Sequence, residues 1–331
     1  MLTVTLYMRP GSAECDQARM DLDALQPLFQ FQLVVVNIET DPVLIEKLQA
    51  LVPVIDCGPF RLKAPVDRKM LQVALGAAND RQRQLEAVGD PGYKKRLERG
   101  HTMSDSDRFS YWFTQHYMMV LNLIVFLYVG LPFLAPILMK VGATAPARVI
   151  YTIYSPLCHE LAFRSWFLFG EQAAYPRTLA GVPGLLTYQQ AIGDETDIAA
   201  ARSFLGNELI GYKVAICQRC VAIYGSILLF GLFFSFTKKW VKSPPWYVWL
   251  IIGILPIAID GFSQLPSLMT GINLSWLPMR ESTPFLRTLT GFLFGVTTAW
   301  YGYPYIEESM RDTRRILTHK IAVVKQTAAP Q

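Results

Sequence analysis

The distribution of apolar and polar residues changes near residue 113. Residues 1–108 alternate apolar and charged positions, as a soluble α/β domain does, whereas the later residues form long uncharged runs rich in Phe, Leu, Ile, Tyr and Trp. The chain therefore divides into a folded domain and a membrane part that a charged segment joins. We expect an α/β domain at 1–80, a charged helical tether at 81–112, a transmembrane domain at 113–306 and a basic cytoplasmic tail at 307–331.

The first part has the pattern of strands and helices in alternation. Strands are expected at 3–7 and 31–39, helices at 12–28, at 41–51 and from 67 onward, and a hairpin in VPVIDCGPFRL. The opening MLTVTLYMRPG has no basic start followed by an apolar core, so it does not have the pattern of a signal peptide. We therefore expect this domain in the cytosol.

Four apolar runs in the second part are expected to cross the membrane as helices, because a span needs about 20 predominantly apolar residues. They are 118–138, 220–236, 246–260 and 286–306. Lys and Arg concentrate on the cytoplasmic side of membrane proteins. Four spans place three basic clusters on one side, which predicts a multi-pass protein of the inner cell membrane with both termini in the cytoplasm. The clusters are Lys94, Lys95, Arg96, Arg99 and Arg108; Lys238, Lys239 and Lys242; and Arg311, Arg314, Arg315 and Lys320.

The segment 147–170 is long enough to span, but Pro156, His159, Glu160 and Arg164 interrupt it. A fifth crossing would also place the later basic clusters on the wrong side of the membrane. We expect a broken or interfacial helix on the outer face that begins at Ser155–Pro156, with Cys158 in its first turn. The membrane domain is thus predicted to be all-α, with about four transmembrane helices plus this broken helix.

The composition supports a membrane protein. Charged residues make up 17% of the 331 residues, below the roughly 25% of soluble domains. The net charge is +5, and no basic stripe of the kind that binds nucleic acid is present. We therefore expect the lipid bilayer and other membrane-protein subunits as partners, and no nucleic acid.

Three of the five cysteines and one of the four histidines are expected at one depth of the membrane domain. In the predicted topology Cys158 and His159 lie outside, and Cys217 and Cys220 lie at the outer mouth of the second span. Two cysteines three residues apart point from one helix face, which suits half of a tetrahedral zinc site. Cys158 and His159 would complete a Cys3His set, provided that the backbone bends near Pro156 so that both neighbours reach one ion.

The same residues also fit redox chemistry. A helix N-terminus and the neighbouring Arg219 favour a thiolate in the Cys217–Cys220 pair, and the outer side is oxidising. Cys158 would then attack or resolve a Cys217–Cys220 disulfide, and a membrane quinone would take the electrons. A static disulfide beside one buried thiol is a third reading, and whether the protein is an enzyme stays open. The candidates for catalysis are Cys158, Cys217, Cys220, Arg219, Asp260 and Arg280, and Asp260 also fits a plain ion pair with Arg280 or Arg287.

Four ordered blocks in the second part resemble an uncharacterised family of small prokaryotic membrane proteins. The blocks are CHELAFRSWFLFG, AICQRCVAIYG, DGFSQL and RESTPFLRTLTGFLFG, within about residues 150–296. The chain departs from the family at Val221–Ala222, where Thr-Gly is usual, and this leaves the cysteines untouched. The resemblance implies no activity, but it implies that nine residues belong together. They are Cys158, His159, Arg164, Ser165, Cys217, Arg219, Cys220, Asp260 and Arg280.

The segment LYMRPGSAECDQARMDLDAL resembles the first strand, active turn and helix of the glutaredoxin-like branch of the thioredoxin fold. The resemblance covers most of residues 1–80 and implies a cis-proline at Pro53. Where that family has its first active-site cysteine, this chain has Ser12, and only the inner Cys15 remains. A serine has no redox chemistry but caps a helix well. We therefore expect a redox-inactive docking domain in an accessory or scaffolding subunit of a membrane complex.

Overall fold

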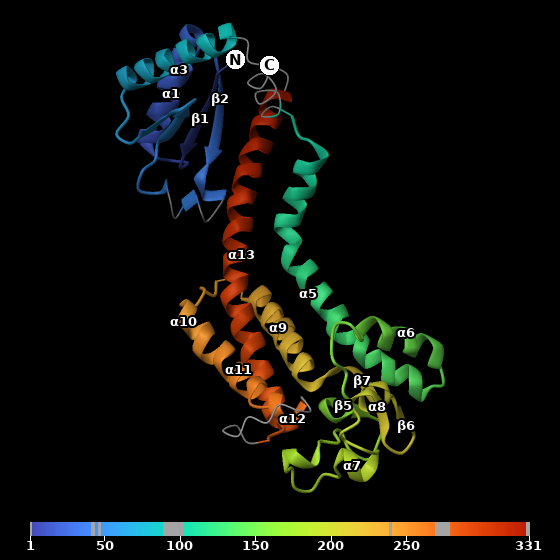
Figure 1. Ribbon diagram of the computed structural model, residues 1–331. Coiled ribbons are helices and arrows are strands. Elements are labelled where there is room, and N and C mark those ends of the chain that lie inside the picture. Colours follow the sequence, from blue (N-terminus) through green and yellow to red (C-terminus); the bar gives the residue numbers. More distant parts are fainter. Residues whose placement is uncertain are drawn as a thin grey trace. The chain divides into compact units, whose positions relative to one another are not determined.

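The computed structural model describes residues 2–40, 44–45, 48–88, 99, 102–237, 240–268 and 279–328 (Figure 1). The chain forms two compact units, one of residues 1–114 with 311–331 and one of residues 115–310. Several predicted features lie outside the described residues. They are the basic residues Lys94, Lys95, Arg96, Lys238 and Lys239, residues 89–98, 100 and 101 of the tether, and parts of the helix expected at 41–51.

The first unit contains a four-stranded sheet in the order β2-β1-β3-β4. Its strands are β1 (Leu2–Met8), β2 (Phe31–Asn37), β3 (Val54–Cys57) and β4 (Phe60–Lys63). β1 is parallel to β2 and antiparallel to β3, and β3 and β4 form the expected hairpin. The crossover between β1 and β2 is α1 (Ala13–Phe29), η1 (Ile38–Thr40) follows β2, and α3 (Arg68–Val88) follows the hairpin.

The core of this unit forms because α1 and α3 carry apolar side chains at helical spacing. Leu22, Leu25, Leu71 and Leu75 are fully buried and pack against Leu6 of β1. The predicted α/β domain is therefore confirmed, with element boundaries within two residues for the first strand, first helix and second strand. The peptide bond before Pro53 is cis.

The second unit is mainly helical. Within the described residues, two helices are long and apolar enough to cross a membrane, α5 (Asp105–Lys140) and α9 (Gln218–Phe236). The third predicted span is a shorter helix made of α10 (Trp246–Val248), the π-helical turn η4 (Trp249–Ile254) and α11 (Leu255–Phe262), followed by α12 (Leu265–Leu268). The fourth lies inside α13 (Pro284–Ala328). The count of four spans is thus not confirmed.

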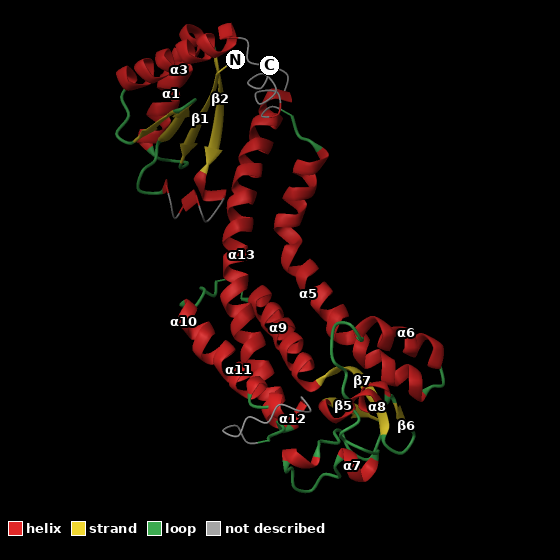
Figure 2. Cartoon of the chain, viewed as in Figure 1, coloured by secondary structure: helices red, strands yellow, loops and turns green. Residues whose placement is uncertain are grey.

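The expectation that this unit is all-α is wrong. A three-stranded antiparallel sheet in the order β5-β7-β6 follows α5 in the chain (Figure 2). Its strands are β5 (Ser165–Leu168), β6 (Gly206–Asn207) and β7 (Gly211–Cys217). The short helix η2 (Ala162–Arg164) precedes β5, and η3 (Thr178–Ala180), α7 (Tyr188–Ala191) and α8 (Ile198–Ser203) lie between β5 and β6.

The helix start predicted at Ser155–Pro156 is also wrong. Ser155 is instead the C-cap of α6 (Thr144–Tyr154), and its backbone N–H donates to the carbonyl of Tyr151. The proline therefore follows a helix rather than opening one, because its ring prevents the helix from continuing. Cys158 lies in the turn after α6, and the segment 147–170 is broken, as expected, but into a helix, a turn and a strand.

Glycines on α13 allow it to approach α9 closely. A Cβ atom added at Gly291 would lie 2.7 Å from the carbonyl oxygen of Arg219, so any larger residue there collides with the backbone of α9. Gly295, four residues later, faces the carbonyl of Ile223 and the hydroxyl of Ser226. Small residues at this spacing let two helix backbones pack together without intervening side chains.

We expect Gly291→Ala to destabilise the second unit by about 1–3 kcal/mol, the usual cost of overpacking. The change would appear as a lower thermal midpoint of tryptophan fluorescence for the full chain in an uncharged detergent. The matched control is Gly302→Ala on the same helix, where an added Cβ meets nothing within 4 Å. That variant is expected to match or slightly exceed the wild-type midpoint, and equal midpoints for both variants would contradict the close packing.

Candidate functional site

The site is built at the junction of β7 and α9. Cys217 is both the last residue of β7 and the N-cap of α9, with an extended backbone. Its neighbours Val214, Ala215 and Ile216 are fully buried, so the strand enters the apolar cluster under α6 before the chain turns into the helix. Cys217 itself is 3% exposed. The strand therefore fixes the position of this thiol before the helix begins.

Cys158 reaches the same point because α6 packs on β7. The hydroxyl of Tyr151 donates to the carbonyl of Lys213, which holds the last turn of α6 against the strand. The chain then turns, and the backbone N–H of Cys217 donates to the sulfur of Cys158 at 3.3 Å. Two cysteines 59 residues apart are thus brought into direct contact.

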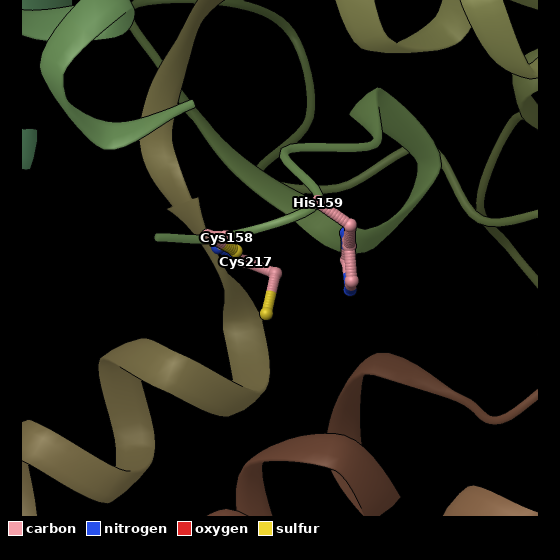
Figure 3. A group of neighbouring side chains, drawn as sticks. All are labelled: Cys158, His159 and Cys217. Carbon is pink, nitrogen blue, oxygen red and sulfur yellow. The ribbon is translucent and has the colours of Figure 1, made fainter. Parts of the chain in front are cut away.

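His159 completes a group of three candidate metal ligands. The ligand atoms of Cys158, His159 and Cys217 all lie within 4.8 Å of one another (Figure 3). Ligands of a tetrahedral zinc ion lie about 3.3–3.8 Å apart, as follows from Zn–S and Zn–N distances of about 2.3 and 2.0 Å. The three side chains therefore need only small adjustments to hold such an ion. Cys220 is not a member of this group, although its thiol is within hydrogen-bonding reach of both other thiols.

The histidine ring is not yet arranged as a ligand. The backbone N–H of Leu161 donates to Nδ1 at 3.2 Å, so the neutral ring carries its proton on Nε2. Metal binding requires a free nitrogen lone pair, and the ring must release this hydrogen bond to offer one. His159 is exposed to solvent as a residue, but partial burial of its ring, together with the nearby guanidinium groups of Arg164, Arg219 and Arg287, lowers the pKa of His159 to about 4. His159 is thus neutral at pH 7, as a metal ligand must be.

The surroundings of Cys217 favour its thiolate form. The thiols of Cys158 and Cys220 are its hydrogen-bonding neighbours and lower the pKa of Cys217 well below that of an ordinary cysteine, and Arg287 adds to the effect. A thiolate is the form that binds metal, and it is also the form that attacks a disulfide. This property therefore suits both chemistries expected from the sequence.

Asp260 is engaged in ion pairs rather than in the group around Cys217. Its carboxylate is paired with Arg219 and, at 3.4 Å, with Arg280, and the hydroxyl of Ser282 donates to it at 3.0 Å. The plain ion pair considered for Asp260 is thus present, with Arg219 in addition to the expected Arg280. The hydrogen bonds and ion pairs found for Asp260, Arg219 and Arg280 in the described part of the chain join them to one another and to Ser263, Ser282 and Gln264 rather than to a thiol.

Sequence reasoning left Glu281 without a role. Its carboxylate is 3% exposed and accepts two hydrogen bonds of 2.9 Å from Arg164, a fork-to-fork pair, and further contacts from Arg177 and Arg287. Arg164 and Glu281 are 117 residues apart, so no local pattern connects them. The available signal was the polar cluster Arg280–Glu281–Ser282 at the mouth of an apolar run.

A buried lysine and a buried glutamate lie near Cys158. Lys213 is fully buried, and its Nζ donates to the carbonyls of Glu160 and Arg202 at 2.8 Å each. Glu160 is 3% exposed, and burial raises the pKa of its carboxyl group to about 7, while burial lowers the pKa of Lys213 to about 8. The Lys213 amine thus anchors the backbone that directly follows Cys158 and His159.

The first unit contains the expected substituted thiol site. Cys15 is fully buried in the first turn of α1, where its sulfur accepts a hydrogen bond of 3.5 Å from the backbone N–H of Arg9. Ser12 occupies the N-cap position of α1, but its side chain makes no capping hydrogen bond, so that part of the expectation is wrong. Cys15 and Cys57 are both free thiols. Burial raises the pKa of Cys57, on β3, to about 12.

Comparisons with known families divide the chain in the same way. Residues 3–76 match a family model described as a glutaredoxin-like domain (DUF836), and residues 199–301 match one described as a predicted membrane protein (DUF2085). Both resemblances stated from the sequence are thereby confirmed. The second match contains Cys217, Cys220, Asp260 and Arg280, whereas Cys158 and His159 precede it.

One curated relative is an uncharacterized protein of the archaeon Methanocaldococcus jannaschii. It is 28% identical over 202 residues, which cover 59% of this chain and 94% of the relative. No solved structure matches the chain. These likenesses support the two-part organisation and carry no activity with them.

We expect Cys57 to resist alkylation by iodoacetamide at pH 8 in the folded protein and to react once urea unfolds the chain. The reason is that a fully buried thiol with a pKa near 12 offers almost no thiolate at that pH. Mass spectrometry of the alkylated peptides measures both states. The positive control is Ser12→Cys, which puts a thiol at the helix N-terminus and is expected to react in the folded state. Rapid native labelling of Cys57 would contradict the burial.

Proposed function

Because the chain joins a glutaredoxin-like domain to a domain of a family of predicted membrane proteins, we propose that it is a metal-binding membrane protein with an accessory or scaffolding role in a membrane complex. The two apolar helices α5 and α9 support membrane insertion. In the proposed topology the apolar parts of α10–α11 and α13 are two further spans, and both termini face the cytoplasm of the inner membrane.

The observation that carries the proposal is the convergence of Cys158, His159 and Cys217 within 4.8 Å. Two cysteines and one histidine are the ligand types of structural zinc sites, and Cys220 is the available fourth ligand. Zinc held by four protein ligands has no open position, so it stabilises a fold rather than performing chemistry. Here it would tie the turn after α6 to the β7–α9 junction.

The glutaredoxin-like domain fits a role in docking. Its nucleophilic position is Ser12, and the thiols of Cys15 and Cys57 are both buried, so it offers no reactive dithiol. A domain of this kind can still bind a partner subunit through its surface. The proposed partners are therefore other membrane-protein subunits, together with the bilayer.

A second function is favoured by the lowered pKa of Cys217 and by the contact of three thiols. In this thiol–disulfide oxidoreductase, Cys217 and Cys220 form a disulfide and release two electrons and two protons. A membrane quinone accepts both and becomes the quinol. Cys158 would then attack or resolve the Cys217–Cys220 disulfide, an exchange in which one sulfur–sulfur bond forms as another breaks and one of the two thiols is released.

Metal content distinguishes the two functions. We expect about one zinc per chain by elemental mass spectrometry of the full chain in mild detergent, with loss of the metal in Cys217→Ser and Cys158→Ser, because each change removes a thiolate ligand. Cys15→Ala is the matched control, since it removes a buried thiol of the first unit and is expected to keep the metal. If the wild-type protein holds no metal and contains a Cys217–Cys220 disulfide that can be reduced reversibly, the metal-binding proposal is wrong and the oxidoreductase is supported.

The topology has its own test in bacterial fusions. We expect green fluorescent protein to fluoresce when fused to either terminus, because it folds in the cytoplasm. Alkaline phosphatase inserted at exposed Gly184 is expected to be active, because the loop carrying it lies outside. The control insertion follows Ser243, between α9 and α10, and is expected to be inactive. Phosphatase activity at Ser243 and none at Gly184 would invert the proposed orientation.

A further inference from the structure

Arginine side chains outnumber carboxylates beside the cysteine–histidine group. Glu281 alone is in contact with three guanidinium groups, those of Arg164, Arg177 and Arg287. Its side chain is 1% exposed, and those of the three arginines are between 2% and 7% exposed. One carboxylate neutralises one guanidinium, so this buried set carries excess positive charge.

Asp260 is shared in the same way on the neighbouring elements. It pairs with Arg219, whose side chain is 19% exposed, and with Arg280, which is 39% exposed. Arg280 also donates to the hydroxyl of Ser263 at 2.6 Å. The Nε atom of Arg219 is buried and, among the described residues, has no hydrogen-bond partner. An unused buried donor points to an acceptor that these side chains do not supply.

The two arginine sets adjoin each other. Ser282, which donates to Asp260 at 3.0 Å, directly follows Glu281 in the chain. Arg287 of the first set donates to the carbonyl of Ser282 at 3.3 Å and to the side-chain oxygen of Gln264, and the amide of Gln264 donates to the carbonyl of Asp260. The guanidinium groups that contact Glu281 and those that contact Asp260 therefore belong to one connected network.

The charges do not balance within this network. Arg177 is left out of the count because the neighbouring Thr178 donates its backbone N–H to a further carboxylate, that of Glu195, at 2.8 Å. The four remaining arginines, Arg164, Arg219, Arg280 and Arg287, then face two carboxylates, those of Glu281 and Asp260. Residues 269–278, which lie between the two sets in sequence, contain no Asp or Glu. One positive charge remains even if Cys217 is a thiolate, and the cost of burying an uncompensated charge is several kcal/mol.

We propose that the cluster formed by Arg164, Arg219, Arg280 and Arg287 is a binding site for a phosphoryl group. The site is independent of whether the neighbouring cysteines hold metal or form a disulfide. The planar guanidinium fork matches the oxygen spacing of a phosphate, and a dianion neutralises the excess charge. Arg280, the most exposed of the four, is the residue through which a ligand approaches.

The test is equilibrium dialysis of radiolabelled inorganic phosphate against the full chain in an uncharged detergent, with ionic strength held constant by chloride. We expect saturable binding by the wild type and an affinity about tenfold lower in Arg280→Gln. Asp260 keeps Arg219 and Ser282 as partners in that variant, so the fold is not expected to depend on the change. The matched control is Arg148→Gln, which removes an exposed arginine of α6 and is expected to leave binding unchanged.

A second variant, Arg280→Lys, keeps the charge and loses the fork, and we expect it to bind with intermediate affinity. Short-chain phosphatidic acid, added as a competitor, identifies the source of the phosphoryl group. Competition means that the site accepts a lipid headgroup, and its absence means that the site takes soluble phosphate. No saturable phosphate binding by the wild type, or equal binding by Arg280→Gln and Arg148→Gln, would overturn the proposal.

Discussion

The ion pairs of the Glu281 carboxylate with Arg164, Arg177 and Arg287 connect segments of the second unit that are far apart in the sequence. Glu281 is buried just before α13, and Arg164 and Arg177 reach it from the segment around β5. Arg164 directly precedes Ser165, which pairs with Cys217 in the β5–β7 register, and Gln218 donates to the carbonyl of Ser165 at 3.1 Å. A buried charge left without its partner is strongly destabilising, so these ionic contacts hold the start of α13 to the segment of β5, and the β5–β7 register places Ser165 opposite Cys217.

The parts of the fold that follow from local patterns were predictable. In the first unit, apolar periodicity identified β1, α1 and β2, and in the second it located the apolar parts of α5 and α9. The β5-β7-β6 sheet was missed because β5 has four residues and β6 has two, too few for an alternating pattern to be visible. Such strands exist only through pairing with β7, which sequence periodicity does not report.

In the candidate site, too, the residues that belong to a local motif were predicted and those defined by distant partners were not. Cys158, His159 and Cys217 were singled out because their residue types and spacing carry metal or thiol chemistry, and the structure brings these three together. Glu281 was missed because its three arginine partners identify it only in the folded chain. Likewise Lys213 resembles an ordinary strand residue until the carbonyls of Glu160 and Arg202 enclose its amine. Buried charges depend on distant partners, whereas ligand motifs are local.

Burial also limits what can reach the thiols. Cys217 and Cys158 are 3% and 8% exposed, while Cys220 is partly buried on the first turn of α9. Thiol–disulfide exchange requires the attacking sulfur to approach along the disulfide axis, and a protein substrate would need α6 or β7 to move away. An ion or a small molecule needs only the side on which solvent reaches His159. The geometry therefore favours small ligands over protein disulfides.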